Sequence, residues 1–355
     1  MASVLEKVHS GSMSLRELPL LEQLEDTAVV VSVPLNVRFR GVEHREALLV
    51  RGPQGWGEFC PFLEYGPDES ARWLACAIET AWEPAPEARR DRIPVNATMP
   101  AVGPERVPEV LGRSRGSVRE VKIKVAEKGQ SLADDVARVR AVRRAAPDAV
   151  LKMDANGGWD HREALEALRA LAEFEPAYVE QPVADIEGLA RLREAADKEG
   201  LRVPVAADES VRKESDPLRV ARLGAADLIV VKAAPLGGPR NALDIIENAG
   251  LPAVVSSALE TSVGMYSGLA LAAALPRLEH GCGLGTASLL AGDLTADPLI
   301  PEDGCLPVRR VSPDPGRLDE FRADGGRRDW WMKRLSNSYQ RLLARGERSG
   351  DAGHE

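Results

Sequence analysis

The feature that most constrains the fold is a strand–loop–helix unit that recurs between about residues 94 and 285. In each unit a short apolar run ends in a polar residue, and a stretch follows with apolar residues at positions i, i+3, i+4 and i+7, as in an amphipathic helix. Strands that alternate with helices are typical of parallel sheets, because parallel neighbours need a crossover connection. The runs are almost continuously apolar, as expected for strands buried on both faces.

The spacing of these units favours a closed barrel over an open sheet. The polar residues that end the runs follow one another at intervals of 24 to 30 residues, and there are six or more such units. No glycine-rich GxGxxG motif follows any of the runs, which weighs against a dinucleotide-binding fold. We therefore predict an α/β fold with a (β/α) barrel over residues 94–300.

Residues outside the predicted barrel have a different pattern. Segment 16–93 contains alternating apolar runs separated by Gly and Pro and then one amphipathic stretch, so we predict a separate α+β domain of antiparallel strands and a helix. We expect residues 1–15 to be a disordered leader or tag and residues 301–345 to contain a helix. The polar tail 346–355 is expected to be disordered.

The overall composition excludes several classes of function. The net charge is −9 at pH 7, whereas a protein that binds a nucleic-acid backbone needs a basic face. No apolar run approaches the ~20 residues needed to cross a bilayer. We therefore predict a cytoplasmic protein with no nucleic-acid partner and no membrane insertion. The sequence leaves the formation of an oligomer open.

Three carboxylates end successive apolar runs of the predicted barrel, namely Asp154, Glu180 and Asp208. Catalytic groups of barrel enzymes lie at the carboxyl ends of the strands. Three carboxylates at one barrel mouth would repel one another unless a cation lay between them. Because no His or Cys accompanies them, they indicate oxygen ligands for a hard cation, with Mg²⁺ as the first choice. Any one of them alone is as well explained as a helix cap, so the prediction depends on all three.

Lysines end the apolar runs on either side of these carboxylates. Lys122 and Lys124 are two residues apart on one predicted strand, so both point to the same face. Lys232 stands in the apolar segment ADLIVVKAAPLGG, where a purely structural lysine is uncommon. In a barrel its strand lies across the mouth from that of Lys124. We expect Lys124 to be a base and proton donor, Lys232 to be a cation on the opposite face, and Lys122 to support them.

This arrangement resembles that of the enolase superfamily, and within it the two-lysine subgroup of the muconate-lactonising enzymes. The segments that carry the resemblance are KIK, KMDAN, YVEQP, AADES and VVKAAPLGG, which match the subgroup's lysine pair, its Asp, Glu and Asp metal ligands and its later lysine. The mandelate-racemase subgroup would need a His later in the barrel, and VVSSALE has none. The resemblance implies a (β/α)7β barrel with a capping domain formed by the N-terminal segment and the C-terminal tail.

Three further segments resemble those of the o-succinylbenzoate synthase family, namely WGEFCPFLEYGPDES, VVSSALETSVG and CGLGTASLLAGDL. This resemblance implies a hydro-lyase of menaquinone biosynthesis that uses Mg²⁺, for which Mn²⁺ can substitute. Its substrate would be the dicarboxylate 2-succinyl-6-hydroxy-2,4-cyclohexadiene-1-carboxylate, which loses water in a syn elimination to give 2-succinylbenzoate. The alternatives within the superfamily are an N-succinylamino acid racemase and a dipeptide epimerase. The intact set of two lysines and three carboxylates disfavours a non-catalytic barrel that only binds a carboxylate.

Residues that contact the rest of the substrate are predicted from their positions alone. Asn156 and Glu209 follow two of the ligands closely and are expected to position ligands or substrate. The candidates for holding the succinyl arm lie near the seventh strand, in the loop after it and in the cap; they are Ser256, Ser257, Ser262, Gly285 and Arg40.

Overall fold

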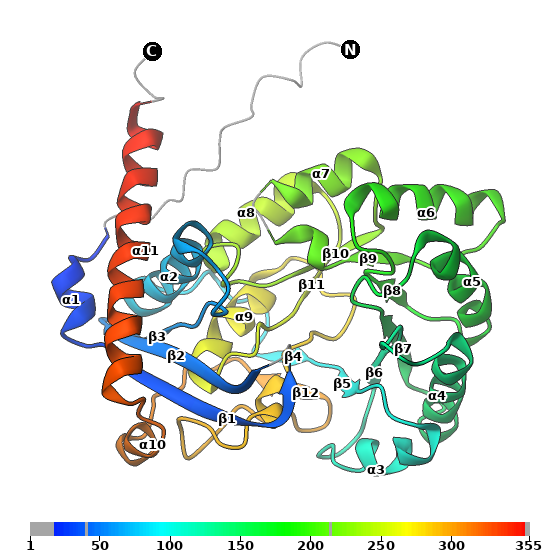
Figure 1. The fold of residues 1–355 in the computed structure, drawn as a ribbon, viewed down its shortest axis with the longest axis horizontal. Helices are drawn as coiled ribbons and strands as arrows, with labels where there is room; N and C mark the ends of the chain where they lie inside the picture. The colour runs from blue at the N-terminus through cyan, green and yellow to red at the C-terminus, as the bar shows by residue number, and fades with distance from the viewer. Residues whose placement is uncertain (1–17, 40–41, 213–214, 352–355) are drawn as a thin grey trace.

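The computed structural model describes residues 18–39, 42–212 and 215–351, which form a cap and a barrel (Figure 1). The cap contains a three-stranded antiparallel sheet in the order β1-β2-β3. Its elements are α1 (Leu21–Glu25), β1 (Val29–Phe39), β2 (Val42–Gly52), β3 (Gly55–Phe59), α2 (Pro67–Trp82) and the late helix α11 (Gly325–Asp351). The leader predicted at residues 1–15 lies outside the described residues.

The barrel is built on a sheet of seven parallel strands in the order β11-β10-β9-β8-β7-β6-β5. Its strands are β5 (Ala97–Met99), β6 (Glu120–Lys124), β7 (Val150–Asp154), β8 (Tyr178–Glu180), β9 (Val205–Ala207), β10 (Leu228–Val231) and β11 (Ala253–Val255). A helix follows each strand; these are α3 (Val107–Leu111), α4 (Leu132–Ala145), α5 (His161–Leu171), α6 (Ile186–Lys198), α7 (Asp216–Leu223), α8 (Pro239–Ala249) and α9 (Ser262–Ala274). Figure 1 shows α4 to α8 around the outside of the sheet.

Residues 282–283 close the barrel as a short eighth strand. Cys282 makes a parallel bridge to Val95 beside β5, and Gly283 makes one to Ser256 beside β11. Seven strand–helix units and a final strand are the arrangement that the (β/α)7β prediction requires, and the prediction is confirmed. The remaining elements are the strand pair β4 (Arg92–Pro94) and β12 (Cys305–Pro307) and the short helix α10 (Pro315–Glu320).

A buried ion pair holds the closing strand from inside the barrel. Lys152 Nζ lies 2.6 Å from Glu120 Oε2 and donates to the carbonyl of Gly281 at 2.6 Å. Both Glu120 carboxylate oxygens accept from the Gly281 N–H at 2.9 Å. The residue before the closing strand therefore has both of its main-chain groups satisfied by side chains of β6 and β7, which compensates for the shortness of that strand.

Side chains that point inward from the strands form an apolar cluster beneath the barrel mouth. Its members precede the strand-end polar residues by two or, for Leu228, four positions and so share their face; they are Tyr178, Ala206, Leu228, Val230 and Val254. This cluster fills the barrel interior on the β8 to β11 side. A ligand on that side is therefore restricted to the carboxyl end of the strands.

The C-terminal helix α11 packs on the cap rather than on the barrel (Figure 1). The guanidinium of Arg334 is mostly buried and donates to the carbonyls of Phe62 at 2.7 Å and Tyr65 at 2.8 Å, which belong to the loop after β3. Helix α11 continues to Asp351, and the predicted disorder of residues 346–355 stays a prediction. The tail is polar, but it contains no proline that would end the helix. Residues 352–355 lie outside the described residues.

A carboxylate from the cap holds the first turn of barrel helix α9. Glu58 on β3 accepts from the N–H groups of Thr261 at 3.1 Å and Gly264 at 3.0 Å, and from the Thr261 hydroxyl. A Cβ at Gly264 would come within 2.8 Å of the Glu58 carboxyl carbon, so this close approach needs glycine. Burial raises the pKa of Glu58 to about 7, although the hydrogen bonds from Thr261 oppose the shift.

We expect Glu58→Gln to flatten the dependence of the free energy of unfolding on pH. Because the folded state raises the pKa of Glu58, the unfolded chain releases this proton first as the pH rises. The native state therefore loses stability between about pH 4.5 and pH 7, and no further loss from this group occurs above pH 7. The shift corresponds to about 3 kcal/mol. Urea unfolding of both proteins from pH 5 to pH 8 measures the effect, and parallel stability curves would contradict it.

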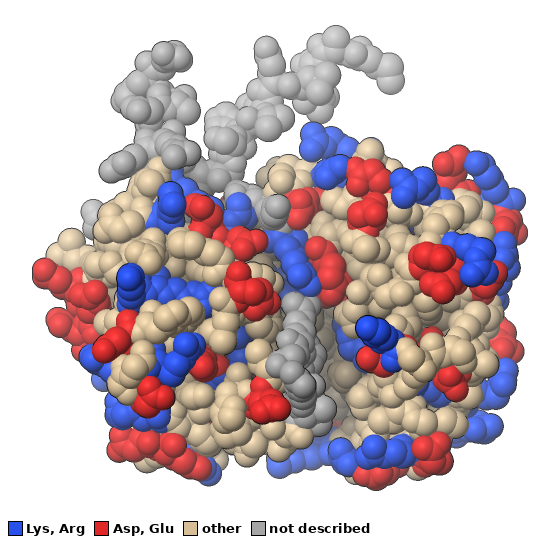
Figure 2. Space-filling view, viewed as in Figure 1, with Lys and Arg blue, Asp and Glu red and all other residues tan. Residues whose placement is uncertain are grey.

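The outer surface carries mixed charge. Figure 2 shows Lys and Arg side chains beside Asp and Glu side chains over this face, with no continuous area of one sign. Surface ion pairs such as Arg169–Glu199, at 2.6 Å, bring opposite charges together. Within the described part of the chain, no helix combines the length and the apolar character that a membrane span requires.

Candidate active site

Strand register brings the predicted site residues to one end of the barrel. Lys124 on β6 pairs with Asp154 on β7, and Asp154 pairs with Glu180 on β8. Glu180 pairs with Ala206, which is two residues before Asp208 on the same face. These side chains therefore meet at the carboxyl ends of neighbouring parallel strands, where barrel enzymes place their catalytic groups.

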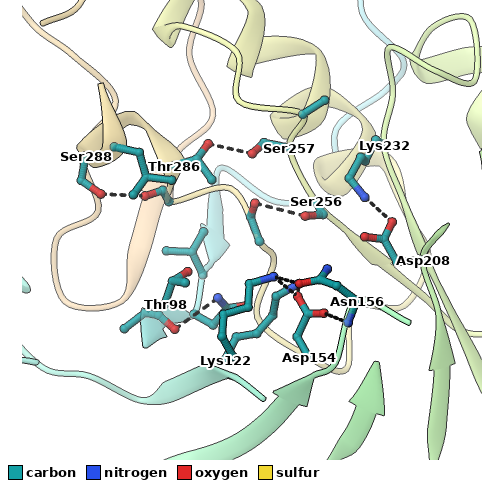
Figure 3. A pocket seen from close by; sticks show the side chains of 18 of the residues that line it. Thr98, Lys122, Asp154, Asn156, Asp208, Lys232, Ser256, Ser257, Thr286 and Ser288 are labelled. Carbon is teal, nitrogen blue, oxygen red and sulfur yellow. Dashed lines mark hydrogen bonds and ion pairs between the residues drawn. The ribbon is translucent and has the colours of Figure 1, made fainter. Parts of the chain in front are cut away.

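Lys124 and Lys232 come from opposite walls of the barrel. In the sheet order β6 and β10 are four steps apart, and the path through β5, residues 282–283 and β11 also takes four steps. This is the largest separation that a closed eight-stranded barrel allows. Figure 3 shows Lys232, which directly follows β10, across the mouth from Lys122 and Asp154.

Two lysine ammonium groups lie among the predicted metal ligands of β7 and β8. Lys122 Nζ is 2.6 Å from Glu180 Oε1 and 3.0 Å from Asp154 Oδ2, and Lys124 Nζ is 2.6 Å from the same Asp154 oxygen. Burial raises the pKa of Asp154, but the positive charges of Lys122 and Lys124 outweigh burial and hold it well below its ordinary value. The site is therefore built to keep positive charge against these oxygens.

The third predicted ligand pairs with the lysine of the opposite wall. Lys232 Nζ donates to Asp208 Oδ1, and the two side chains are 16% and 8% exposed (Figure 3). Burial raises the pKa of Asp208, but the charges of Lys232 and Lys122 outweigh burial, so the pKa lies below its ordinary value.

One oxygen of Glu180 indicates that a cation fits between these carboxylates. Its Oε2 atom is buried and has no hydrogen-bond partner among the described residues. Burial, together with the negative charge of Asp154, raises the pKa of Glu180 to about 8. Because an unpaired buried polar atom is costly, a ligand for it is expected, and an all-oxygen donor set suits a hard divalent ion.

The lysines occupy part of the space that such an ion would need. As placed among the described residues, no three His, Cys, Asp or Glu side chains are close enough together to hold an ion. The ammonium groups of Lys122, Lys124 and Lys232 contact the three carboxylates instead. A divalent ion fits the chemistry of the donors, and it would replace contacts that the lysines now make.

Asn156 connects the predicted base with the strand of the third ligand. Lys124 Nζ donates to Asn156 Oδ1 at 2.7 Å, and Asn156 Nδ2 donates to Glu209 Oε1 at 3.3 Å. Asn156 has a left-handed backbone with φ of +46°, and its N–H donates to Asp154 Oδ1 at 3.1 Å. The amide is therefore oriented with its oxygen toward Lys124, and the positioning function of Asn156 and Glu209 stays a prediction.

Gln181 supports the site in a way that its position in the sequence alone does not reveal. Its buried Oε1 atom accepts from the N–H groups of Asp208 at 3.0 Å and Ser210 at 3.1 Å, and its Nε2 atom donates to the carbonyl of Val183 at 2.8 Å. The side chain thus ties the end of β8, which carries Glu180, to the end of β9. The sequence offers one indication of this role, which is that a polar residue directly follows a predicted metal ligand in the segment Glu-Gln-Pro.

A cavity of about 1840 Å³ lies over the strand ends, between barrel and cap. The cap contributes Phe62 and Tyr65 from the loop 60–66, and Asn36 from β1. The predicted site residues that line it are Lys122, Lys124, Asp154, Asn156, Asp208, Glu209, Lys232, Ser256, Ser257 and Gly285. Glu180 lies buried beneath them, and Arg40 lies outside the described residues.

Ser262 is placed away from this cavity, so its predicted contact with substrate is wrong. It is the first residue of α9 and is fully buried. Its hydroxyl donates to Asp293 Oδ2 at 2.6 Å and accepts from the N–H of Leu299 at 2.8 Å. The helix begins at this residue, with Thr261 as its N-cap, and the hydroxyl is used to fix the later loop rather than to face the mouth.

Comparison with solved structures supports the fold. The muconate lactonizing enzyme from Pseudomonas putida has a TM-score of 0.68 at 22% identity, with 83% of this chain and 98% of that chain covered. The 2-chloromuconate cycloisomerase from Rhodococcus opacus has a TM-score of 0.69 at 24% identity, with 84% and 98% covered. Both likenesses extend over the cap and the barrel.

Comparison with family models and curated relatives identifies the family. The models "Enolase C-terminal domain-like" and "Enolase N-terminal domain-like" match residues 107–317 and 30–81. The o-succinylbenzoate synthase of Mycolicibacterium smegmatis is 54% identical over 319 residues, which are 90% of this chain and 97% of that protein. That of Mycobacterium tuberculosis is 51% identical over 327 residues, with 92% and 98% covered. The chain belongs to the enolase superfamily and, within it, to the family of the o-succinylbenzoate synthases, which typically use a divalent metal.

Proposed function

We propose that this chain removes water from 2-succinyl-6-hydroxy-2,4-cyclohexadiene-1-carboxylate and forms 2-succinylbenzoate, a step of menaquinone biosynthesis. The observation that carries the proposal is the pair of lysines, Lys124 and Lys232, which reach one cavity from opposite walls beside three buried carboxylates. The reaction needs a base on one face of the ring, positive charge on the other and a cation at the ring carboxylate. Each requirement has a candidate among these residues.

Asp154, Glu180 and Asp208 are the residues that would hold the metal. Their oxygens, which include the unpaired Oε2 of Glu180, suit Mg²⁺, and Mn²⁺ would accept the same ligands. When bound, Mg²⁺ supplies the positive charge that stabilises the negative charge developing on the ring carboxylate.

Lys124 acts as the base and then as the acid. Its amine takes the proton alpha to the ring carboxylate, and the C–H electron pair enters the ring. The C–O bond to the hydroxyl then breaks, and the departing hydroxide receives the proton from Lys124 and leaves as water. One amine serves both steps because the proton and the hydroxyl leave from the same face. Asn156, which accepts from Lys124 Nζ at 2.7 Å, helps to hold the amine in place.

Lys232 acts through its charge on the other face of the ring. It comes from the wall opposite Lys124, and only 16% of its side chain is exposed. A charge in such a poorly hydrated position interacts more strongly with an anion than a charge in water does. Lys232 therefore stabilises the anionic intermediate and needs to carry no proton in the dehydration.

The succinyl arm is assigned to the wall after β11. Ser257 Oγ lies 2.7 Å from Thr286 Oγ1, and Ser256 and Gly285 line the same part of the cavity (Figure 3). Hydroxyl groups and main-chain N–H groups are donors that a carboxylate or a ketone of the arm can use. Thr286 is an addition to the residues predicted from the sequence.

A racemase of N-succinylamino acids, or a dipeptide epimerase, is the second candidate. The same geometry favours it, because inversion of a carbon centre requires one amine to remove a proton and another to deliver a proton to the opposite face. Lys124 and Lys232 are placed on opposite walls in a way that satisfies this need. In that case both lysines would exchange protons, whereas dehydration requires only Lys124 to do so.

A coupled assay of the purified protein separates these functions. We expect turnover of the cyclohexadiene substrate in Mg²⁺, loss of turnover in EDTA, and its return on addition of Mn²⁺. A panel of N-succinylamino acids, tested under the same conditions, is expected to be racemised more slowly. Faster racemisation than dehydration would favour the second candidate, and binding of the substrate without any turnover would indicate a non-catalytic barrel.

A further inference from the structure

A buried arginine of the cap binds the main chain of the barrel. Arg45 on β2 is 3% exposed, and its guanidinium donates to the carbonyl of Leu259 at 3.0 Å and to that of Ala258 at 3.1 Å. The same guanidinium also donates to the carbonyl of Cys60 in the cap. One rigid, planar group therefore joins the segment after β11 to the segment after β3.

These two segments form facing parts of the cavity wall. Ala258 lines the cavity together with Ser256 and Ser257, which directly precede it. Cys60 opens the loop 60–66, from which Phe62 lines the cavity on the cap side. The guanidinium carbon of Arg45 also lies 4.5 Å from the centre of the Phe62 ring, a distance typical of a cation–π contact.

The barrel segment adopts a conformation that needs support from outside. Leu259 has a φ of +67°, in the left-handed region that side-chain-bearing residues rarely adopt. Such strain persists only where neighbouring groups hold the chain in place. Arg45 binds the carbonyls of this turn, and Glu260 Oε2 accepts from the N–H of Ala258 at 2.7 Å. Side chains therefore hold this turn through its main-chain carbonyls and through one main-chain N–H group.

We propose that Arg45 is a positioning residue for substrate recognition, which sets the place of the 256–258 wall relative to the cap loop 60–66. This inference rests on the proposed function, because it assigns the arm of that substrate to the 256–258 wall. Arg45 is not among the residues that line the cavity, so it acts through the two segments that it joins. Loss of its contacts weakens substrate binding and leaves the proton transfer by Lys124 largely intact.

The test compares Arg45→Lys with Arg90→Lys in the full-length protein. Lysine keeps the charge of Arg45 but has a compact head, which cannot span three carbonyls as a guanidinium does. Arg90 is a matched control, because its guanidinium, like that of Arg45, donates to several main-chain carbonyls. These carbonyls lie at the C-terminal end of α9, which is remote from the carboxyl ends of the strands. Its acceptors are the carbonyls of Ala272, Ala273 and Leu275.

For Arg45→Lys we expect KM for the cyclohexadiene substrate to rise by about tenfold, while kcat changes by less than about threefold. The affinity for the product, 2-succinylbenzoate, measured by calorimetry, should fall by a similar factor. Amide hydrogen exchange across residues 256–264 should become faster. For Arg90→Lys we expect a lower melting temperature with KM and product affinity unchanged.

The outcomes separate this inference from the proposed function. Turnover by the unaltered protein tests the function, whereas the difference between the two arginine variants in product affinity and in amide exchange tests the role of Arg45. An unchanged product affinity in Arg45→Lys, or an equal loss in Arg90→Lys, would overturn the positioning role. If Arg45→Lys does not fold, Glu260→Ala loosens the same turn from its N–H side, and an unchanged KM in that variant would also overturn it.

Discussion

Lys124→Ala is expected to lower the rate of dehydration by about 10³-fold or more and to abolish exchange of the alpha proton with solvent deuterium. The variant removes the amine that takes the proton and returns it to the departing hydroxide. Lys122 keeps its contacts with Asp154 and Glu180, so it is not placed to replace the lost base. Single-turnover kinetics and proton NMR in deuterium oxide measure the two effects, with circular dichroism as the control for folding.

Lys232 variants complete this first test, because they distinguish a charge from a base. Lys232→Ala should also be slow in dehydration, since it removes positive charge from the face opposite Lys124. Lys232→Arg retains the charge but cannot act as a base at neutral pH, so it should recover part of the dehydration rate and none of any racemase rate. Undiminished dehydration by Lys124→Ala, or two-way racemisation by Lys232→Arg, would contradict the assigned roles.

Asp208→Asn is expected to weaken Mg²⁺ binding by at least about 100-fold and to lower turnover at limiting Mg²⁺ by a comparable or larger factor. Asparagine has nearly the same shape as aspartate, but it lacks the charge that a hard cation requires. The variant also leaves Lys232 without the carboxylate that it contacts in this structure. Saturating Mg²⁺ should therefore restore activity only in part.

Calorimetric titration with Mg²⁺ measures the loss of affinity directly, without reliance on turnover. Asp148→Asn is a suitable control, because this substitution also removes one negative charge and Asp148 is exposed in the turn before β7. We expect the control to bind Mg²⁺ as the unaltered protein does. Near-normal activity of Asp208→Asn at low Mg²⁺ would show that Asp208 is not a ligand.

The barrel could be predicted from the sequence because its signal is local and repeated. Each strand is a short apolar run next to its own helix, so Asp154 and Glu180 could be placed at strand ends without knowledge of any distant contact. Parallel pairing then brings successive strand ends together, and the observed register of Lys124, Asp154 and Glu180 follows from this rule. The alternation in the cap sheet is a local signal of the same kind.

Contacts between distant segments left no comparable signal. The hydrogen bond from Arg45 to Ala258 spans 213 residues, and that from the Thr261 N–H to Glu58 spans 203. Neither partner belongs to a periodic pattern that would indicate the other. Ser262 was misassigned for the same reason, because its buried partner Asp293 lies in a later loop. Periodicity predicts elements and their order, whereas side chains that join one domain to another depend on how the finished elements dock.

The attachment of α11 to the cap has a consequence for the order in which the protein is completed during synthesis. The cap loop 60–66 emerges early from the ribosome, but the guanidinium that holds its carbonyls belongs to Arg334, which is translated about 270 residues later. The barrel strands between them can pair while the loop still lacks this support. The carbonyls of Phe62 and Tyr65 in the cap wall of the cavity therefore gain this partner only after the C-terminal helix is released, when every predicted catalytic residue has already been translated.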